Sequence, residues 1–180
     1  AVFAHVKNLP EVTAEALAEI EPEALAAVGV SATPRDNEGS YMPCFLTGII
    51  AAESFAAGSG TEVHRFSHQS GHIMAALYSS GALAEGKLMT SEFLAFHVSG
   101  GTTEVLHVRP EANKMNIELI GGSNDLHAGQ FIDRVGVKLG LGFPAGPALE
   151  QMAMRGKAQA KLPIWVRGNE CSFSGTESAA

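Results

Sequence analysis

Charged and aromatic side chains are scarce in this sequence, at 17% and 7% of its 180 residues. No uninterrupted apolar run reaches the roughly 18 residues that a membrane-spanning helix requires, and the nearest candidate, 45–57, is broken by Glu53. The first residues lack the charged-then-apolar order of a signal peptide. Hydrophobic residues nevertheless make up 46% of the chain, which excludes a disordered polypeptide. We therefore expect a soluble, cytoplasmic globular protein without a membrane partner.

Cysteines and basic runs are also few. The two cysteines, Cys44 and Cys171, stand far apart without a C-x-x-C pattern, which favours reduced thiols. Twelve Lys and Arg stand against nineteen Asp and Glu, which leaves a formal net charge of −7. Because Lys and Arg contacts to phosphates supply most nonspecific affinity for nucleic acids, we do not expect this chain alone to hold DNA or RNA tightly.

The hydrophobic pattern predicts an α/β fold, a mixed sheet with flanking helices. The length alone predicts one domain, or one compact domain plus a small appendage. The pattern gives helix, strand, helix, strand and helix, then three consecutive strands, then two helices. Helices are expected at 10–20, 43–57, 68–80, 127–140 and 145–156, and strands at 26–34, 61–67, 92–100, 102–110 and 113–122.

His68 and His72 form the first candidate site. Four residues apart on a helix, they share one face with Cβ atoms about 5–6 Å apart, which suits two ligands of one metal ion. Ser67 is a suitable N-cap for that helix. A zinc peptidase would need the pattern HExxH, with Glu as general base. Gln69 stands at that position and cannot take a proton, so peptidase chemistry is disfavoured. A chance pair of surface histidines is the alternative.

The second candidate is the segment 98–103, VSGGTT, between two apolar strands. Paired glycines let backbone N–H groups approach a phosphate, and the flanking hydroxyls add donors. The alternative is an ordinary two-residue hairpin turn centred on the two glycines. No GKS or GKT follows, so the segment is not a Walker loop.

Asp133 and Gly146 form the third candidate. Asp133 lies on the second turn of the helix expected at 127–140, and Gly146 lies near the start of the next helix, where backbone amides attract anions or hydroxyl oxygens. A carboxylate beside such a helix start is a common way to hold ribose hydroxyls. A solvated helix charge at a helix–helix corner is the alternative.

Taken in order, the motifs resemble the TsaD family, the universal tRNA threonylcarbamoyladenosine synthase subunit, formerly called O-sialoglycoprotein endopeptidase or glycoprotease. The resemblance begins at Phe3 and runs through FAHVKNLPEV, SHQSGHIMAA, FHVSGGTTEVL, DLHAGQFIDRVGVKLGLGFPAGPALE and ECSFSG. It implies the actin, Hsp70 and sugar-kinase type of fold, in which two ribonuclease-H-like lobes close on a nucleotide.

The resemblance also implies roles for the candidate residues. His68 and His72 would ligate one divalent metal ion, iron or zinc, which would act as a Lewis acid. Asp133 and Gly146 would hold the ribose of ATP or of threonylcarbamoyl-adenylate. The threonylcarbamoyl group would move to the exocyclic amine of an adenosine beside the tRNA anticodon, and no catalytic side chain is implied. The phosphates or the carbamoyl group would contact Val98, Ser99, Gly100, Gly101 and Thr102.

The family further implies partners. The tRNA would be held through partner subunits rather than by this acidic chain, and a TsaB-like paralogue and a TsaE-like ATPase are implied. The family opens with an acidic glycine-containing hairpin and closes with a segment that carries a metal-binding Asp, and neither occurs here. We therefore expect a central fragment, with residues 1–90 at the end of the first lobe and 91–180 at the start of the second. Such a fragment is expected to bind metal and ATP weakly and to expose apolar patches that promote a homodimer.

Departures from the family pattern indicate a divergent paralogue. Thr102 stands where the family usually has His, and Leu126 and Gln130 replace an Asp and a Glu of the pattern Asp-Asp-Ala-Ala-Gly-Glu. Three functions are therefore compared: a metal- and ATP-dependent enzyme of tRNA modification, a non-catalytic assembly module, and a glycoprotease-type metallopeptidase. Retention of His68 and His72 argues against the module, and Gln69 argues against the peptidase.

Overall fold

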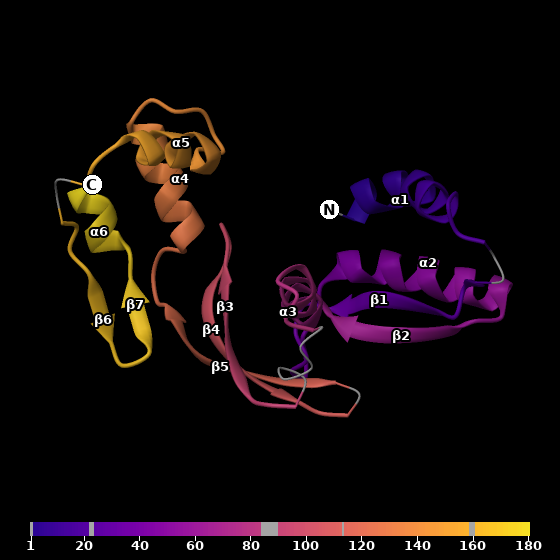
Figure 1. Cartoon of the computed structure of the whole chain (residues 1–180). Helices are drawn as coiled ribbons and strands as arrows, with labels where there is room; N and C mark the ends of the chain where they lie inside the picture. Colours follow the sequence, from indigo (N-terminus) through magenta and orange to yellow (C-terminus); the bar gives the residue numbers. More distant parts are fainter. Residues whose placement is uncertain (1, 22–23, 84–89, 113, 159–160) are drawn as a thin grey trace. The chain divides into compact units, whose positions relative to one another are not determined.

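Two separate sheets organise the chain, one in each of two units, 1–89 and 90–180. The computed structural model describes residues 2–21, 24–83, 90–112, 114–158 and 161–180. Helices flank both sheets (Figure 1), so the predicted mixed α/β class is confirmed. Residue 113, where the last strand of the meander was expected to begin, lies outside the described residues. Among the helices that are described, none combines the length and apolarity needed to cross a bilayer.

Unit 1 is built on a parallel pair of strands. β1 (Ala27–Thr33) and β2 (Glu62–Ser67) pair in parallel, with Val28 opposite Val63. Parallel neighbours need a crossover connection, and α2 (Pro43–Ser59) supplies it, packing on β1. α2 has Pro at its first position and ends at Gly60, whose φ of 69° suits glycine.

Two further helices complete unit 1. α1 (Val2–Leu17) packs against α2, and α3 (His68–Ser79) begins directly where β2 ends and buries Ile73 and Leu77. The predicted start of α1 at Pro10 was wrong, because the helix begins at Val2 and Pro10 lies inside it. A proline inside a helix removes one backbone donor, and here the turns on both sides of it remain helical.

Unit 2 holds a five-stranded mixed sheet in the order β3-β4-β5-β7-β6. Antiparallel pairing joins β3 to β4 and β4 to β5, which is the predicted meander. β5 then pairs in parallel with β7, and β6 lies antiparallel to β7. Leu106 and Val108 of β4 are almost fully buried. The strands are β3 (Phe93–Val98), β4 (Thr103–Pro110), β5 (Met115–Ser123), β6 (Trp165–Arg167) and β7 (Glu170–Ser172).

The helices of unit 2 are α4 (Ala128–Lys138), α5 (Gly146–Arg155) and α6 (Ser174–Ala179). α4 and α5 approach closely, since a Cβ added at Gly136 would lie 2.3 Å from the Cβ of Ala145. α6 is joined to α4 by the ion pairs of Glu177 with Arg134 and Lys138.

The prediction that two helices close the chain was incomplete, because β6, β7 and α6 follow them. Strands of three residues carry too little alternation to stand out. Their signal is the Gly168–Asn169 pair at the hairpin turn, where Gly168 has a φ of 61°.

Candidate functional site

The two candidate metal ligands lie at the start of α3 in unit 1. Ser67 caps this helix, with its Oγ accepting a hydrogen bond from the Ser70 N–H at 3.0 Å. The Nε2 atoms of His68 and His72 are 3.0 Å apart. Both side chains are exposed, and the His68 ring meets the ring of Phe45 edge-on, with centroids 5.7 Å apart. The predicted helical spacing therefore brings the two imidazoles together.

The separation of the two nitrogens fits a shared divalent ion. Two metal–nitrogen bonds of about 2.0–2.1 Å, at the angles of octahedral or tetrahedral coordination, place the nitrogens about 2.9–3.4 Å apart. The donor set also fits, because imidazole suits both zinc and iron. Within the described ranges no group of three or more His, Cys, Asp or Glu residues could hold a metal. The described part of the chain thus offers a pair of imidazoles, which leaves the remaining positions of an ion to other ligands.

The candidate phosphate-binding segment in unit 2 is a tight hairpin turn between β3 and β4. Val98 pairs with Thr103, and the Ser99 N–H donates to the Thr102 carbonyl at 2.8 Å. A Cβ added at Gly100 or Gly101 would meet no atom within 4 Å. The turn interpretation thus describes the backbone correctly. Because open space lies beside both glycines, the backbone stays accessible to a ligand, and phosphate binding there stays a prediction.

The N-terminus of α4 is docked on this turn. The Gly129 N–H donates to the Ser99 carbonyl at 3.1 Å, and the Ala128 N–H donates to the Thr103 Oγ1 at 2.8 Å. Two of the N–H groups that a helix start leaves without intrahelical partners are satisfied in this way. A Cβ on Gly129 would lie 2.6 Å from the backbone nitrogen of Gly100. Sequence reasoning included Thr103 in the candidate segment without predicting its contact with α4, and it missed Gly129, although glycine at the second position of a helix is itself a signal of close backbone approach.

Asp133 and Gly146 both lie at the corner between α4 and α5. The Asp133 Oδ1 accepts a hydrogen bond from the Ala145 N–H at 2.8 Å, and Ala145 is the residue before the first residue of α5. Asp133 also lies four residues after Gly129, on the same face of α4. The structure therefore places Asp133 against the residue that precedes Gly146, and one carboxylate oxygen of Asp133 is used in a hydrogen bond at the helix–helix corner. A role in ribose binding stays a prediction.

Asp125 joins the loop before α4 to the start of α6. Its Oδ1 accepts from the Phe173 N–H at 2.9 Å, and its Oδ2 accepts from the Ser174 N–H at 3.2 Å and from the Ser172 hydroxyl. Slight burial raises the pKa of Asp125, but hydrogen bonds from these three residues and from Leu126 outweigh it and hold the pKa well below its usual range. The sequence could not show this role, because Phe173 is 48 residues away.

Replacing Asp125 with alanine is expected to lower the free energy of unfolding of unit 2 by about 1–2 kcal/mol near neutral pH, because exposed charge-assisted hydrogen bonds are lost. A carboxyl with a depressed pKa contributes stability above the unfolded-state pKa of about 3.9, and this contribution fades as the pH falls below it. The difference between parent and variant should therefore shrink below about pH 4.

The measurement is urea unfolding followed by the fluorescence of Trp165, the single tryptophan, which lies in β6 opposite Ser172. Glu150→Gln, on the exposed surface of α5, is the matched control and should leave the midpoint unchanged. A difference between Asp125→Ala and the parent that stays constant from pH 7 to pH 3 would contradict the expectation.

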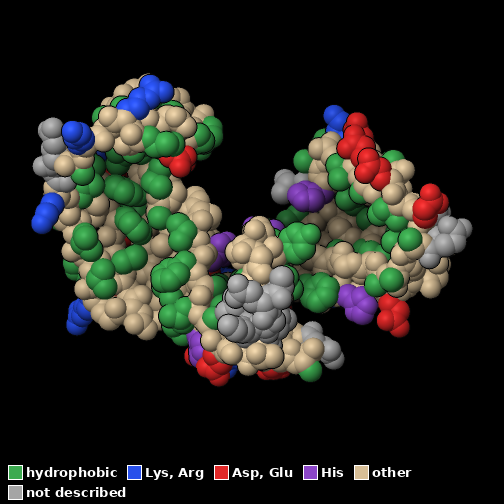
Figure 2. All heavy atoms as spheres, in the orientation of Figure 1, with side chains coloured by type: hydrophobic (Ala, Val, Ile, Leu, Met, Phe, Trp, Pro, Cys, Tyr) green, Lys and Arg blue, Asp and Glu red, His purple; other side chains and the backbone are tan. Residues whose placement is uncertain are grey.

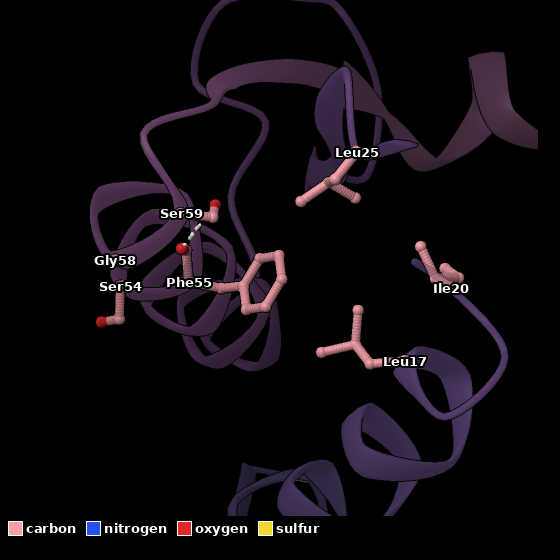
Figure 3. A pocket seen from close by; sticks show the side chains of 7 residues that line it. All are labelled: Leu17, Ile20, Leu25, Ser54, Phe55, Gly58 and Ser59. Carbon is pink, nitrogen blue, oxygen red and sulfur yellow. Dashed lines mark hydrogen bonds between the residues drawn. The ribbon is translucent and has the colours of Figure 1, made fainter. Parts of the chain in front are cut away.

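An apolar cavity of about 520 Å³ lies within unit 1 between α1, α2 and the segment that precedes β1. Figure 3 shows Leu17, Ile20, Leu25 and Phe55 pointing toward one another across it, with Ser54 turned away. The predicted site residues do not line this cavity. It is therefore separate from the candidate metal ligands of the same unit.

The types of side chain exposed at the surface differ between α1 and unit 2. Figure 2 shows acidic side chains gathered over α1, to which the exposed residues Glu11 and Glu15 belong. Hydrophobic side chains are spread over unit 2 in the same view, and Leu94 and Phe96 of the edge strand β3 are exposed by 57% and 72%. The acidic surface of α1 does not suit direct contact with phosphates.

Comparison with known proteins gives one consistent result. The model of the family TsaD, tRNA N6-adenosine threonylcarbamoyltransferase, matches residues 1–180. A tRNA N6-adenosine threonylcarbamoyltransferase of Magnetococcus marinus is 31% identical, over 98% of this chain and 48% of its own length. A protein of the same name from Syntrophomonas wolfei is 33% identical, over 98% and 50%.

A third relative, from Methanothermobacter thermautotrophicus, is named a probable bifunctional tRNA threonylcarbamoyladenosine biosynthesis protein. It is 30% identical, over 98% of this chain and 30% of its own length. The chain thus spans about half the length of the first two relatives and less than a third of this one.

Proposed function

We propose a function from the premise that this chain belongs to the TsaD family of tRNA N6-adenosine threonylcarbamoyltransferases. The protein takes part in the biosynthesis of threonylcarbamoyladenosine in tRNA. Its reaction is the transfer of a threonylcarbamoyl group from an ATP-derived adenylate to the exocyclic amine of an adenosine. The observation that carries the proposal is the match of the family across the whole chain. The converging imidazoles of His68 and His72 support it.

His68 and His72 are proposed to hold one divalent metal ion, iron or zinc. When bound, such an ion supplies Lewis acidity to the carbonyl group under attack. The chain's own contribution is to keep both Nε2 atoms 3.0 Å apart on one exposed helix face, open to a substrate. Gln69 is buried and carries an amide, so the site has no general base at the position where a zinc peptidase needs one. We therefore do not extend the proposal to peptide hydrolysis.

The turn between β3 and β4 is proposed to bind the phosphates of ATP or the threonylcarbamoyl-adenylate. Its support is the open space beside Gly100 and Gly101 and the position of the α4 N-terminus directly behind the turn. The positive end of a helix dipole favours an anion in front of it. Asp133, one turn further along α4, and Gly146, at the start of α5, are proposed to hold the ribose. The residues assigned to the phosphates or the acyl group are Val98, Ser99, Gly100, Gly101 and Thr102.

We propose that residues 1–90 belong to the first lobe of a two-lobe protein and residues 91–180 to its second lobe. The metal ligands then lie in the first lobe, and the nucleotide-binding turn lies in the second. The relatives are about twice as long as this chain, so we propose that the complete reaction needs parts of the fold that this sequence does not contain. Copies of the chain are proposed to associate through exposed apolar patches.

Contact with tRNA is proposed to run through partner subunits. The net charge of −7 and the acidic surface over α1 disfavour phosphate contacts by this chain. A TsaB-like paralogue and a TsaE-like ATPase are the proposed partners. The test is to extend the chain to full length and to incubate it with those partners, tRNA, threonine, bicarbonate and ATP. The modified nucleoside, measured by mass spectrometry, is the expected product, and its absence would overturn the proposed transferase activity.

A non-catalytic assembly module is the second candidate, favoured by the first turn of α4. Gln130 stands where the family usually has Glu, and its Oε1 accepts a hydrogen bond from the His127 N–H at 3.2 Å. The side chain thus caps its own helix, in the manner of a capping box. A full-length protein that binds its partners but contains no metal and forms no modified nucleoside would establish this second function.

A further inference from the structure

A carboxylate outside the predicted site lies against the start of α3. Asp36 belongs to the segment between β1 and α2, and its Oδ2 accepts hydrogen bonds from the hydroxyls of Ser67 and Ser70, each at 2.8 Å. Both serines are buried, with 1% and 8% of their surface exposed. Asp36 itself is exposed. The cluster therefore joins an open loop to the buried base of the helix that carries His68 and His72.

Proton counting shows that this cluster needs a hydrogen-bond acceptor at residue 36. The oxygens of Ser67 and Ser70 are also 2.8 Å apart, so two hydroxyl protons serve three oxygen–oxygen contacts. An ionised carboxylate only accepts. If one serine donates to the other, the second serine donates to Asp36, and otherwise both donate to it. Without an acceptor at Asp36, at least one of the two buried hydroxyl protons has no acceptor among these groups, which is unfavourable.

The same loop also accepts a backbone hydrogen bond from the first turn of α3. The Gln69 N–H donates to the Pro34 carbonyl at 3.1 Å, and the Ser70 N–H donates to the Ser67 Oγ at 3.0 Å. The loop is held in turn, because the Arg35 N–H donates to the Ser40 Oγ at 2.9 Å. His68 thus lies between two residues, Ser67 and Gln69, that are each hydrogen-bonded to the segment 34–36.

We propose that Asp36 is a positioning residue that fixes the His68–His72 pair through Ser67 and Ser70. Both imidazoles are exposed, so burial of the rings does not set their orientation. The His68 ring contacts the rings of Phe45 and His72, and the backbone of the first turn sets where these contacts can form. Asp36 is not itself a ligand, because it forms no group of three metal-binding residues within the part of the chain that the structure describes. Its negative charge also lies at a helix N-terminus, where an anion is favourable.

This inference rests on the proposed metal site. The loss of metal affinity expected when Asp36 is replaced follows from metal proteins in general. Replacing residues that orient metal ligands commonly weakens metal binding about 10–100-fold. The test uses Asp36→Asn, which keeps the shape of the side chain, removes its charge and replaces one of its two acceptor oxygens with an NH₂ donor. Glu38→Gln is the matched control, since Glu38 is an exposed acid of the same loop. Zn²⁺ alone is the probe, titrated into the protein by calorimetry.

Asp36→Asn is expected to weaken Zn²⁺ binding about tenfold, and Glu38→Gln is expected to leave it within twofold of the parent. A double-mutant cycle then separates positioning from general charge. In a Ser70→Ala background, Asp36→Asn should have a clearly smaller effect, because residues that act through a shared hydrogen bond are not additive. The proposal would be overturned if Asp36→Asn changed the Zn²⁺ affinity equally in both backgrounds. It would also be overturned if Asp36→Asn and Glu38→Gln changed that affinity equally.

A second readout needs no metal. The imidazole ¹H–¹⁵N correlations of His68 and His72 in the metal-free protein should shift or broaden in Asp36→Asn and stay as in the parent in Glu38→Gln. If the parent binds no Zn²⁺, the metal part of the proposed function fails, while these spectra still decide the role of Asp36. Imidazole spectra of Asp36→Asn that match the parent would then overturn the positioning role. Far-ultraviolet circular dichroism confirms that each variant is folded.

Discussion

Replacing His72 with alanine is expected to lower the Zn²⁺ affinity of the protein by more than about 100-fold. Changing residues that only orient metal ligands already costs 10–100-fold, and removal of a ligand should exceed that. The geometry makes the two imidazoles interdependent, because their Nε2 atoms are 3.0 Å apart and would meet the same ion. A single remaining imidazole, at His68, cannot chelate. His68→Ala should therefore have an effect of the same size.

His64→Ala is the control for this experiment. His64 is an exposed residue of β2 in the same unit, and its Nε2 lies 3.8 Å from a carboxylate oxygen of Glu62. Its removal should leave Zn²⁺ binding within twofold of the parent, measured by calorimetry and by elemental analysis after dialysis. If His64→Ala and His72→Ala weaken binding equally, the ion is held by scattered surface histidines, and the chance-pair interpretation is correct.

The predicted parts of the fold are those that depend on residues close together in the sequence. Pro43 and Gly60 delimit α2 as the sequence indicates, because a proline start and a glycine end act within one turn. The approach of His68 and His72 was predictable for the same reason, since residues four apart on a helix are neighbours. Alternation likewise predicted the strands of the meander.

The parts that the sequence did not reveal depend on contacts between distant residues. Ser67 and Asp36 are 31 residues apart, and Ser172 and Asp125 are 47 apart. Periodicity carries no information about such pairs, because it records only which face of an element is apolar. The side chains of Asp36 and Asp125, which hold the candidate sites in place, were therefore absent from the predicted set, and Thr103 was predicted only as part of the segment between the two strands. The family match shows relatedness to transferases but assigns no contact to these residues.

Replacing Gly129 with alanine is expected to displace the turn between β3 and β4 and to weaken the binding of ATP at least tenfold, the equivalent of about 1.4 kcal/mol. The added Cβ would lie 2.6 Å from the Gly100 nitrogen and 2.7 Å from the carbonyl group of Ser99. These are backbone atoms, so the conflict cannot be relieved by rotation of a side chain. The hydrogen bond from the Gly129 N–H to the Ser99 carbonyl would lengthen or break.

The sign of the change in unfolding free energy distinguishes helix propensity from overpacking in Gly129→Ala. Alanine favours a helix interior over glycine by about 1 kcal/mol, so propensity alone predicts that Gly129→Ala stabilises α4. Overpacking typically costs about 1–3 kcal/mol, and here it acts on a backbone that cannot yield. Gly175→Ala is the matched control, because Gly175 also lies in a helix, and a Cβ there would meet no atom within 4 Å.

Urea unfolding, followed by Trp165 fluorescence, should show destabilisation for Gly129→Ala and none for Gly175→Ala. Equilibrium titration with ATP should show weakened binding for the first variant alone. A Gly129→Ala protein as stable as Gly175→Ala would mean that the turn is not docked on α4, and the nucleotide site proposed in front of that helix would lose its support.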